Sequence, residues 1–513
     1  MTRSDRLVTL LVLLAVIGCL TEASASAQDR IGCDDLFRLK IENVNLHSSA
    51  SVPAQADLPA YCRVLGGVRP AINFEVRLPM ADWNGKFYMT GCGGFCGMLQ
   101  SDLPSFANAM NFGLRRHYAV STMDSGHWGS TAMDGRWAFH NRVAEVDFAW
   151  RAVTETARVS KTLVAAFYGA APRKSYFAGC STGGRMAATE AQRFPNDFDG
   201  LIAGAPALDY TGLAGIWNAW IVKANTGKDG KPILNPGKVR LVGDAVVKAC
   251  GHADLIVDDP GTCAFQPRHL QCRGADRPDC LTAAEVSVIE KWYAEPRNSR
   301  GDVLVPAAVP RGSEVFWPRW LTGEPDGTPA RVPQFARDFL RYMAFPDDPG
   351  ESYDTGQFDF DRDPARMKPL SDLYNATNPD LTRFRDRGGK LIMYHGWADA
   401  IVPPGISTTY WTAVTAKMGG AAAVSGFYRL FMVPGFDHCG FQPGPGIAQS
   451  GLDPLTALEN WVENGVAPDV LVATRYAADG KAERVRAICP YPQVARFKGG
   501  DPNDPANYAC VVR

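Results

Sequence analysis

The sequence predicts an α/β fold in which a mostly parallel sheet is flanked by helices and interrupted by one large insertion. After residue 28, short apolar runs alternate with amphipathic stretches, as in successive strand–helix units. This alternation stops near residue 208 and resumes near residue 387. The chain has 513 residues, enough for a core of about 250–300 residues and a further domain.

Before the insertion, four short apolar runs have the length and flanking turn residues of buried strands. They lie at 86–89, 118–121, 175–178 and 201–203. Two longer amphipathic stretches predict helices at 144–167 and 185–193, and Pro195 ends the second of them. After the insertion, the same criteria predict a strand at 390–394, a helix at 408–417 and a strand at 428–433.

The insertion, which we call the lid region, is rich in Pro, Gly, Asp and Trp and carries four cysteines. Only 283–293 and 332–342 have clear helical patterns there. Because exposed tryptophans are unfavourable in a solvated linker, we expect a packed lid domain. The predicted division is a signal peptide at 1–27, a catalytic core at 28–207 and 387–513, and the lid region at 208–386.

The N-terminus has the pattern of an export signal. Arg3 and Arg6 precede the apolar run 7–18, and Ala25-Ser26-Ala27 provides a cleavage site. That run is too short to span a bilayer, which needs about 20 apolar residues, and no later segment is apolar enough. The sequence therefore predicts a periplasmic or secreted protein without a transmembrane segment. In the alternative interpretation, Cys19 is the lipidated residue of a lipoprotein signal.

The composition excludes one class of partner. The formal net charge is −1, whereas a nucleic-acid binder usually carries a basic surplus or stripe. We therefore expect a small-molecule substrate and no nucleic-acid partner, and the sequence leaves the oligomeric state open.

The cysteine count supports export independently. Removing Cys19 from the 13 cysteines leaves an even number, which permits six disulfides in an oxidising compartment. Clustered cysteines could instead bind zinc, but no paired histidines lie nearby at ligand spacing. Pairing by short separation leaves Cys180 and Cys439 over, to pair across a long stretch of chain or to remain free thiols. The short-range pairs are Cys33–Cys62, Cys92–Cys96, Cys250–Cys263, Cys272–Cys280 and Cys489–Cys510.

A candidate nucleophile lies between the strand at 175–178 and the helix at 185–193. Gly179-Cys180-Ser181-Thr182-Gly183 matches the G-x-S-x-G elbow of α/β-hydrolases, in which a strained turn exposes the serine hydroxyl. A bare match could be a glycine-rich loop without chemistry. The strand–turn–helix context favours Ser181 as a nucleophile.

A serine hydroxyl needs a base, and four of the eight histidines follow Ser181. His252 and His269 fall in the irregular lid region and are expected at the surface. His395 and His438 both follow predicted strands.

Chain order separates these two histidines, because the order in this fold is serine, acid, histidine. Asp399 lies in the turn after His395 and precedes His438, so we assign His438 as base and Asp399 as the acid that orients it. Asp437 is adjacent to His438 in the chain. Because the side chains of neighbouring residues diverge, Asp437 is less suited than Asp399 to orient the imidazole. His395 is then expected to be a structural turn residue.

Two backbone N–H groups must stabilise the oxyanion of the tetrahedral intermediate. The amide of Thr182, directly after Ser181, is expected to be one donor. The other is expected from the glycine-rich turn 91–97, at Gly93 or Gly94. The alternative is a tight glycine loop held by a disulfide and without chemistry.

These motifs together resemble the tannase/feruloyl esterase family, which includes mono(2-hydroxyethyl) terephthalate hydrolase. The resemblance rests on Gly-Cys-Ser-Thr-Gly-Gly at 179–184, His-Gly-Trp-Ala-Asp at 395–399 and Val-Pro-Gly-Phe-Asp-His-Cys at 433–439. It extends from about Cys33 to Cys510. It implies a lid over an α/β-hydrolase core, a Cys180–Cys439 disulfide, an acyl-enzyme on Ser181, and esters of ferulic, caffeic, gallic or terephthalic acid as substrates.

One departure concerns calcium, which members of that family usually bind in a lid loop. Here the loop after Cys250 is short, and Asp254, Asp258 and Asp259 are fewer oxygen ligands than calcium prefers. We therefore expect no cofactor for catalysis and weak calcium binding or none. Aromatic lid residues could stack on an aromatic acyl group or pack the lid core. They are Trp217, Trp220, Phe316, Trp317 and Trp320, with Trp397 in the core.

Two other function classes are compatible with parts of the sequence. A Cys- and Trp-rich exported chain could be a non-catalytic binding protein, but the ordered serine, acid and histidine argue against it. The same residues could also transfer acyl groups to alcohols instead of water. Hydrolysis of an aromatic ester, feruloyl-esterase-like, is the function that the sequence favours, with galloyl esters or terephthalate monoesters as alternatives.

Overall fold

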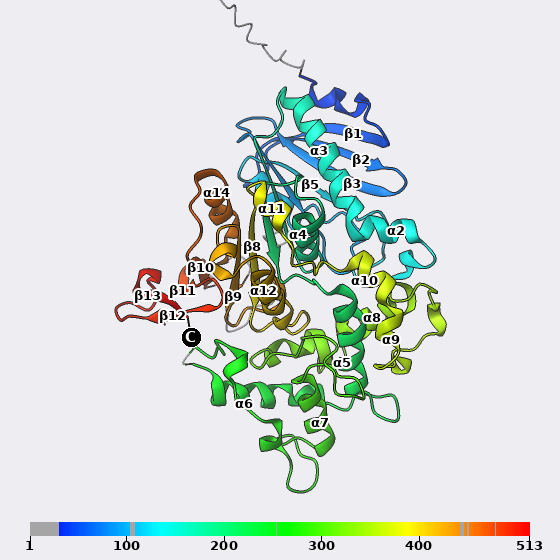
Figure 1. Ribbon diagram of the computed structural model, residues 1–513, viewed down its shortest axis with the longest axis vertical. Coiled ribbons are helices and arrows are strands. Elements are labelled where there is room, and N and C mark those ends of the chain that lie inside the picture. Colours follow the sequence, from blue (N-terminus) through cyan, green and yellow to red (C-terminus); the bar gives the residue numbers. More distant parts are fainter. Residues whose placement is uncertain are drawn as a thin grey trace, which may run out of the picture.

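Figure 1 shows the computed structural model of the protein, with the strands of the core above and the helices of the lid region below. The described residues are 30–102, 108–252, 254–441, 446–448, 451–477 and 479–512. The predicted signal peptide and Cys19 lie outside them. Within the described residues, no helix is both long enough and apolar enough to cross a membrane.

A nine-stranded sheet forms the centre of the core, in the order β1-β2-β3-β5-β4-β6-β7-β8-β9. From β5 to β9 all neighbouring strands are parallel, which confirms the predicted α/β class. Strands β1 to β3 add an antiparallel edge that the sequence analysis did not predict. The strands are β1 (Val44–Val52), β2 (Tyr61–Val68), β3 (Ile72–Pro79), β4 (Lys86–Thr90), β5 (Ala119–Met123), β6 (Lys174–Cys180), β7 (Gly200–Gly204), β8 (Lys390–Gly396) and β9 (Tyr428–Val433).

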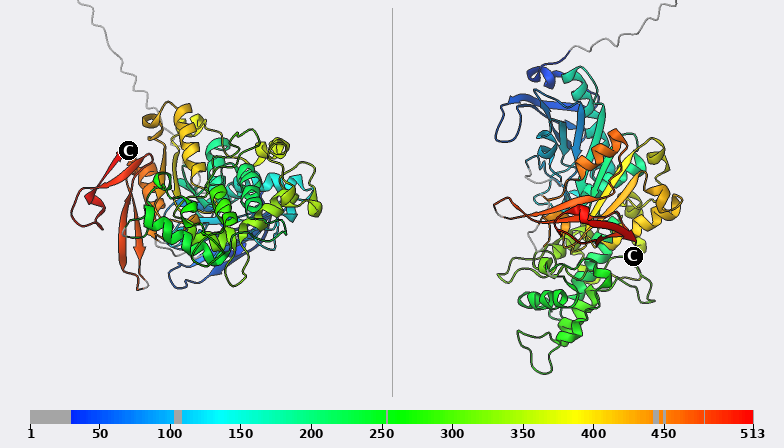
Figure 2. Two further views of the ribbon diagram at one scale, coloured as in Figure 1. Left: turned by 90° about the horizontal axis from the view of Figure 1, so that it is seen from below. Right: turned by 90° about the vertical axis from the view of Figure 1, so that its left-hand side faces the viewer.

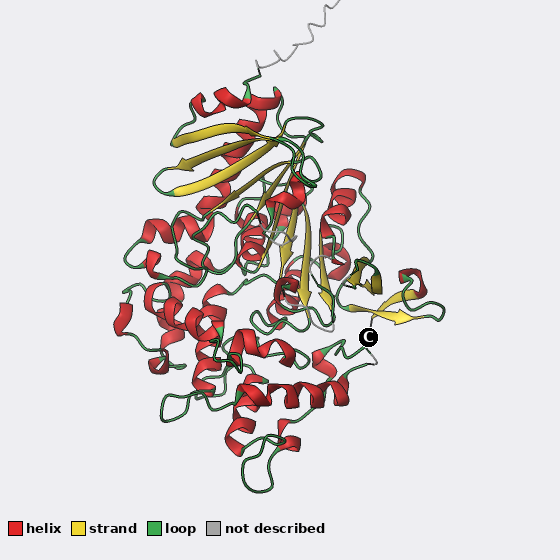
Figure 3. Ribbon diagram, turned by 180° about the vertical axis from the view of Figure 1, so that it is seen from behind, coloured by secondary structure: helices red, strands yellow, loops and turns green. Residues whose placement is uncertain are grey.

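Helices cover both faces of this sheet because alternate residues of each buried strand point to opposite sides. Phe177 and Leu391 belong to one apolar cluster, whereas Tyr176 and Ile392 belong to the other. Figure 3 shows the sheet from behind, between its two layers of helices. The first layer is α3 (Ala152–Tyr168), α4 (Thr182–Arg193) and α12 (Gly405–Lys417), and the second is α1 (Met110–Leu114) and α14 (Pro454–Asn464).

The predicted helix at 144–167 is present but is not uniform. It comprises α2 (Arg142–Val146), a π-helical turn η3 (Asp147–Arg151) and α3 in direct succession. The predicted helix at 408–417 begins earlier, at Gly405, and α13 (Ala421–Val424) follows it.

The elements of the lid region, between β7 and β8, are helices in the described residues (Figure 1). The helices predicted at 283–293 and 332–342 correspond to α7 and α8. Helix α6 was not predicted, because Gly243 interrupts its pattern and Lys238 at its N-cap gives no capping signal. The helices are α5 (Asn218–Ala224), α6 (Val239–Cys250), α7 (Ala283–Trp292), α8 (Arg331–Tyr342), α9 (Asp363–Arg366), α10 (Lys368–Tyr374) and α11 (Thr382–Asp386).

The C-terminal residues form two small antiparallel sheets that project from the side of the core, as Figure 2 shows. The first sheet pairs β10 (Leu471–Tyr476) with β11 (Ala482–Ile488), and the second pairs β12 (Gln493–Phe497) with β13 (Tyr508–Val512). The sequence analysis did not predict these hairpins.

All six predicted cysteine pairings are present. Five close short loops of 4 to 29 residues. The sixth, Cys180–Cys439, joins cysteines 259 residues apart, with their Cα atoms separated by 6.0 Å.

Candidate active site

Ser181 lies in the sharp turn between β6 and α4, with φ 64° and ψ −122°. Such a positive φ is strained for a residue with a side chain, and this strain is typical of a nucleophile elbow. A Cβ atom at Gly179 would approach the backbone of Gly183 to 2.4 Å, so the turn requires glycine there. The Ser181 amide donates to the Gly204 carbonyl at 2.9 Å, which fixes the turn to β7.

Asp399 and His438 are hydrogen-bonded to each other. The 2.7 Å contact joins His438 Nδ1 to Asp399 Oδ2, so this nitrogen faces Asp399 and not the adjacent Asp437. Asp399 is fully buried, and its Oδ1 accepts from the amides of Ile401 and Val402 at 3.0 and 2.8 Å. Burial by itself raises the pKa of Asp399, but the neighbouring imidazoles hold this pKa below its usual range. Asp399 is therefore ionised and faces His438.

Ser181 and His438 line one cavity of about 480 Å³. The Cys180–Cys439 disulfide connects the residues next to each of them. The structure thus brings the three predicted residues of the serine–histidine–aspartate set to one place. This arrangement permits the proton of a serine hydroxyl to pass to an imidazole that a carboxylate orients.

His395 is a second histidine beside Asp399, and it is fully buried. Its Nε2 lies 2.7 Å from the Val402 carbonyl and 3.4 Å from Asp399 Oδ2. Because both of these oxygens accept, Nε2 carries a proton. Its Nδ1 contacts the Ser407 hydroxyl at 2.7 Å. His395 therefore connects the loop after β8 to α12 and supports the carboxylate that orients His438.

The turn 91–97 lies beside Ser181 and is closed by the Cys92–Cys96 disulfide. The Thr182 hydroxyl donates to the Gly94 carbonyl at 2.6 Å, which fixes this turn to the start of α4. Gly93 and Gly94 both line the cavity that contains Ser181. Gly94 has φ 59°, and a Cβ atom there would lie 2.2 Å from the Ala132 carbonyl oxygen.

The buried histidine His127 contacts the turn 91–97. Burial lowers the pKa of His127 to about 4, so its imidazole is neutral. Its Nε2 lies 2.7 Å from the Phe95 carbonyl oxygen, and its Nδ1 lies 3.3 Å from the Ser125 carbonyl oxygen. The His127 ring also stacks on Trp137, with a centroid separation of 3.7 Å. Within the part of the chain that the structure describes, no backbone hydrogen bond uses the amide of Gly93 or Gly94.

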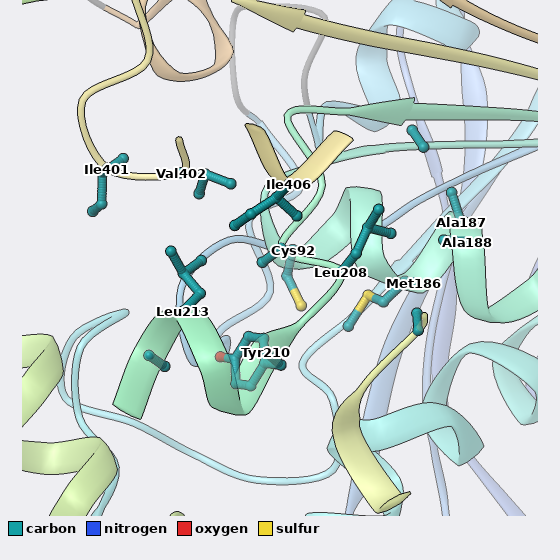
Figure 4. Close-up of a cluster of buried hydrophobic side chains, with 14 of the residues drawn as sticks. Cys92, Met186, Ala187, Ala188, Leu208, Tyr210, Leu213, Ile401, Val402 and Ile406 are labelled. Atoms are coloured by element: carbon teal, nitrogen blue, oxygen red, sulfur yellow. The ribbon is translucent and has the colours of Figure 1, made fainter. Parts of the chain in front are cut away.

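Two compartments open from Ser181. The wide cavity described above is accompanied by a narrow, mostly apolar slot of about 50 Å³. Ser181, Gly94, Phe335 and Ile401 line both compartments, so Phe335 and Ile401 form the partition. Figure 4 shows part of the slot wall, where Tyr210 and Leu213 come from one segment and Ile401 and Val402 from the loop after β8. An ester bound at Ser181 can therefore place its acyl and alcohol parts in different compartments.

Aromatic and cationic side chains form one wall of the wide cavity. The π-helical turn η9 (Pro318–Thr322) presents Arg319 and Trp320, and α8 presents Arg331 and Phe335 on one face. The Arg319 and Arg331 guanidinium carbons lie 5.1 and 5.3 Å from the centroid of the Trp320 ring. Trp320 also meets His438 edge-on, with centroids 5.7 Å apart.

Among the described residues, neither of these two arginines forms an ion pair, and no carboxylate lines the wide cavity. The buried Nε of Arg319 also lacks a hydrogen-bond partner within the described part of the chain. Burial and the charge of Arg319 both lower the pKa of Arg331. Positive charge therefore accumulates in the wall of the wide cavity, which no carboxylate of the described residues lines.

The other aromatic residues considered for acyl stacking lie elsewhere. Trp217, Phe316 and Trp317 are at most 2% exposed and pack the lid core. Trp220 donates its indole N–H to the Lys291 carbonyl. Trp397 lines a separate cavity beside the C-terminal hairpins. Of that set, Trp320 is the one that lines the wide cavity.

The candidate calcium loop contains ion pairs between aspartates and arginines. Arg486 on β11 pairs with Asp254, and its Nη1 lies 2.8 Å from Asp258 Oδ1. Arg484 pairs with Asp254 at 3.1 Å. Asp259 Oδ1 instead accepts from the Gly261 amide at 2.8 Å and caps a short helical turn. Burial raises the pKa of Asp254, but Arg486 outweighs this effect and lowers it.

Several residues of this site were not found from the sequence. Arg319, Arg331, Phe335 and Asn218 carry no local motif, and they lie far from Ser181 in the chain. The available signal was the i, i+4 spacing of Arg331 and Phe335 on a predicted helix. That spacing says that they share a face but not what the face contacts.

Comparisons with known proteins agree with this geometry. A family model described as tannase and feruloyl esterase matches residues 57–511. An uncharacterized esterase of Xanthomonas campestris pv. campestris is 36% identical, with 100% of this chain and 96% of that protein covered. A mono(2-hydroxyethyl) terephthalate hydrolase of Piscinibacter sakaiensis is 35% identical, with 91% of this chain and 87% of that protein covered. The crystal structure of feruloyl esterase B from Aspergillus oryzae is similar with a TM-score of 0.81 and 28% identity, covering 94% of this chain and 100% of that one.

Proposed function

The chain belongs to the tannase and feruloyl esterase family, and on that basis we propose that it hydrolyses esters of aromatic acids through Ser181, His438 and Asp399. The observation that supports this proposal most is the buried Asp399–His438 hydrogen bond beside a cavity that Ser181 also lines. Because the residues adjacent to Ser181 and His438 are joined by a disulfide, the nucleophile and its base have a fixed separation.

The proposed reaction has two halves. Ser181 Oγ attacks the ester carbonyl while His438 takes the hydroxyl proton, and the oxyanion accepts from the Thr182 amide and from Gly93 or Gly94. His438 then gives the proton to the departing alcohol, which leaves an acyl group on Ser181. In the second half, water attacks this acyl-enzyme, His438 again transfers the proton, and the aromatic acid is released. No metal or cofactor takes part in these steps.

The acyl group is proposed to be a phenolic acid, as in the relative that is named a feruloyl esterase. Trp320, Phe335 and Phe441 line the wide cavity and offer ring faces and edges to an aromatic acyl group. Steady-state kinetics on methyl ferulate, methyl caffeate and methyl gallate test this proposal. Hydrolysis of aliphatic esters with equal kcat/KM would contradict it.

A second candidate substrate is an aromatic half-ester that retains a carboxylate, as the relative named for mono(2-hydroxyethyl) terephthalate hydrolyses. Arg319 and Arg331 favour it, because they have no carboxylate partner among the described residues and a guanidinium binds a carboxylate through charge-assisted hydrogen bonds. The same cavity thus offers stacking surfaces for a ring and positive charge for its acid substituent.

For this candidate we expect Arg331→Gln to lower kcat/KM for a monoalkyl terephthalate by about 10- to 100-fold. For the neutral amide analogue, a monoalkyl terephthalamate, the same substitution should lower kcat/KM less than about threefold, because this substrate carries no charge for Arg331 to pair with. Measuring both substrates on both enzymes provides the control. An equal loss for the two substrates would indicate damage to the cavity instead of lost charge recognition.

We also propose that Arg486 and Arg484 balance the aspartates of the lid loop in place of calcium. EDTA should then leave the Tm unchanged, as thermal unfolding with and without added calcium measures. Arg486→Ala should lower the free energy of unfolding by about 3–5 kcal/mol, because it leaves the nearly buried Asp254 without its closest partner.

Arg484→Ala is the matched control, since the Arg484 side chain is 41% exposed. Its loss should cost about 0–1 kcal/mol. A large fall in Tm on chelation, reversed by calcium, would show that the loop binds the metal through other oxygens.

The protein is further proposed to act after export, as a periplasmic or secreted enzyme. The N-terminal signal pattern and the six disulfides support this location. Lipid anchoring through Cys19 remains the alternative, and mass spectrometry of the mature N-terminus distinguishes the two.

A further inference from the structure

One polar side chain of the narrow slot, that of Asn218, takes no part in the proposed catalytic steps. Asn218 lines the slot that opens from Ser181 and is only 4% exposed. Its amide oxygen has no hydrogen-bond partner among the described residues. The other polar groups of the slot are accounted for. The hydroxyls of Thr182 and Tyr210 both donate to the Gly94 carbonyl, and Ser181 is the candidate nucleophile.

An irregular segment of the lid region places Asn218 in the slot. A π-helical turn, η4 (Gly212–Trp217), runs directly into α5, of which Asn218 is the first residue. Leu213, Ala214 and Asn218 all line the slot, as the wider spacing of a π-helical turn allows. Turns of this kind occur frequently at functional sites, because they redirect a side chain that an α-helix would bury elsewhere.

An unpaired buried amide is unfavourable, and most buried polar groups in native proteins are paired. Leu would fill a similar volume in an apolar wall without that cost. The amide is therefore explained best by a partner that arrives with the ligand. The slot is too small for an extended group, at about 50 Å³. A neutral amide in an apolar slot favours a neutral hydrogen-bonding group, and a hydroxyl can pair with either end of the amide.

We propose that the slot and Asn218 form a subsite for a hydroxyl group of the ester substrate. This inference rests on the proposed esterase function and adds a specificity-determining residue to it. The hydroxyl belongs either to a short alcohol part or to the ring of the acyl part, and only the end of the group that carries this hydroxyl has to enter the slot. In both cases Asn218 makes the ester with the hydroxyl a better substrate than the same ester with a methyl group in its place.

Two pairs of isosteric esters test the proposal and separate these sources. The alcohol pair is 2-hydroxyethyl benzoate and propyl benzoate, and the acyl pair is methyl 4-hydroxybenzoate and methyl 4-methylbenzoate. For each pair we measure the kcat/KM of the hydroxyl ester divided by the kcat/KM of the methyl ester. In one pair this ratio should be about 10- to 100-fold higher for the wild-type enzyme than for Asn218→Leu. Taking this ratio between enzymes cancels the intrinsic reactivity of each ester. The pair that responds identifies the half of the substrate that occupies the slot.

Asn218→Ala provides a second removal of the amide in case the leucine variant does not fold. Leu213→Ala is the size control, since it enlarges the same slot and should alter both members of a pair alike. Titration with a serine-directed phosphonate gives the active fraction of each preparation. If both Asn218 variants keep the wild-type ratio in both pairs, the inference is overturned. If the wild type hydrolyses none of the four esters, the proposed function fails instead.

Discussion

Ser181→Ala is expected to lower kcat for aromatic ester hydrolysis by about four to six orders of magnitude. Removal of the hydroxyl eliminates the acyl-enzyme, because this hydroxyl is the one that the turn between β6 and α4 places in the cavity shared with His438. Folding should be retained, since Ser181 contributes to the elbow through its backbone bonds to Gly204 and Ala207. Circular dichroism and the Tm check the fold, and burst-phase kinetics with a nitrophenyl ester measure the lost acylation.

Covalent labelling supplies the control for this prediction. A phosphonate that reacts with activated serines should modify wild-type Ser181 alone, as peptide mass spectrometry detects. It should leave Ser181→Ala unmodified. Labelling at another serine, or a variant that retains substantial turnover, would refute Ser181 as the nucleophile.

Asp399→Asn is the second change with a large expected effect, a loss of about 10⁴-fold in kcat with KM little altered. Asn can keep the bonds from the Ile401 and Val402 amides through its oxygen. Its NH₂ group would then face Nδ1 of His438, which must accept in that arrangement. The imidazole is forced into the wrong tautomer, with a proton on the nitrogen that should remove the one from Ser181.

Asp437→Asn is the matched comparison, because Asp437 is the adjacent, equally buried carboxylate. It should keep most of the activity, since His438 Nδ1 already bonds to Asp399 at 2.7 Å. Both variants are compared with His438→Ala, which should match Ser181→Ala. If Asp437→Asn lost most of its kcat and Asp399→Asn kept it, Asp437 and not Asp399 would be the acid.

The residues of the candidate catalytic set were predictable because each depends on local sequence or on chain order. Ser181 lies in a turn that requires glycine at Gly179, because the backbone of Gly183 approaches there, and at Gly183, because the Asn108 side chain lies against it. The pattern is therefore visible in five residues. Asp399 and His438 follow strands and occur in the order that the fold requires. The cysteine count left Cys180 and Cys439 over once the short loops were assigned, and the family resemblance implied that they pair.

The walls of the two compartments were not predictable, because long-range packing determines them. Asn218 and Arg319 are placed by π-helical turns, which have no sequence signature in a single chain. The edge strand β1 escaped prediction for a related reason. It is half-exposed and polar, with His47, Ser48 and Ser49 in its middle, so it lacks the apolar run of a buried strand.

The long-range disulfide has a consequence for how the enzyme is made. For the exported enzyme proposed above, Cys439 would enter the oxidising compartment after Cys250, Cys263, Cys272 and Cys280, because it follows them in the chain. Cys180 must meanwhile stay reduced or exchange partners, because an early bond to any of these four would separate the nucleophile from its base. We therefore expect the yield of active enzyme to rise when thiol–disulfide exchange is catalysed during folding. We expect production in a reducing cytoplasm to leave Cys180 and Cys439 unbonded.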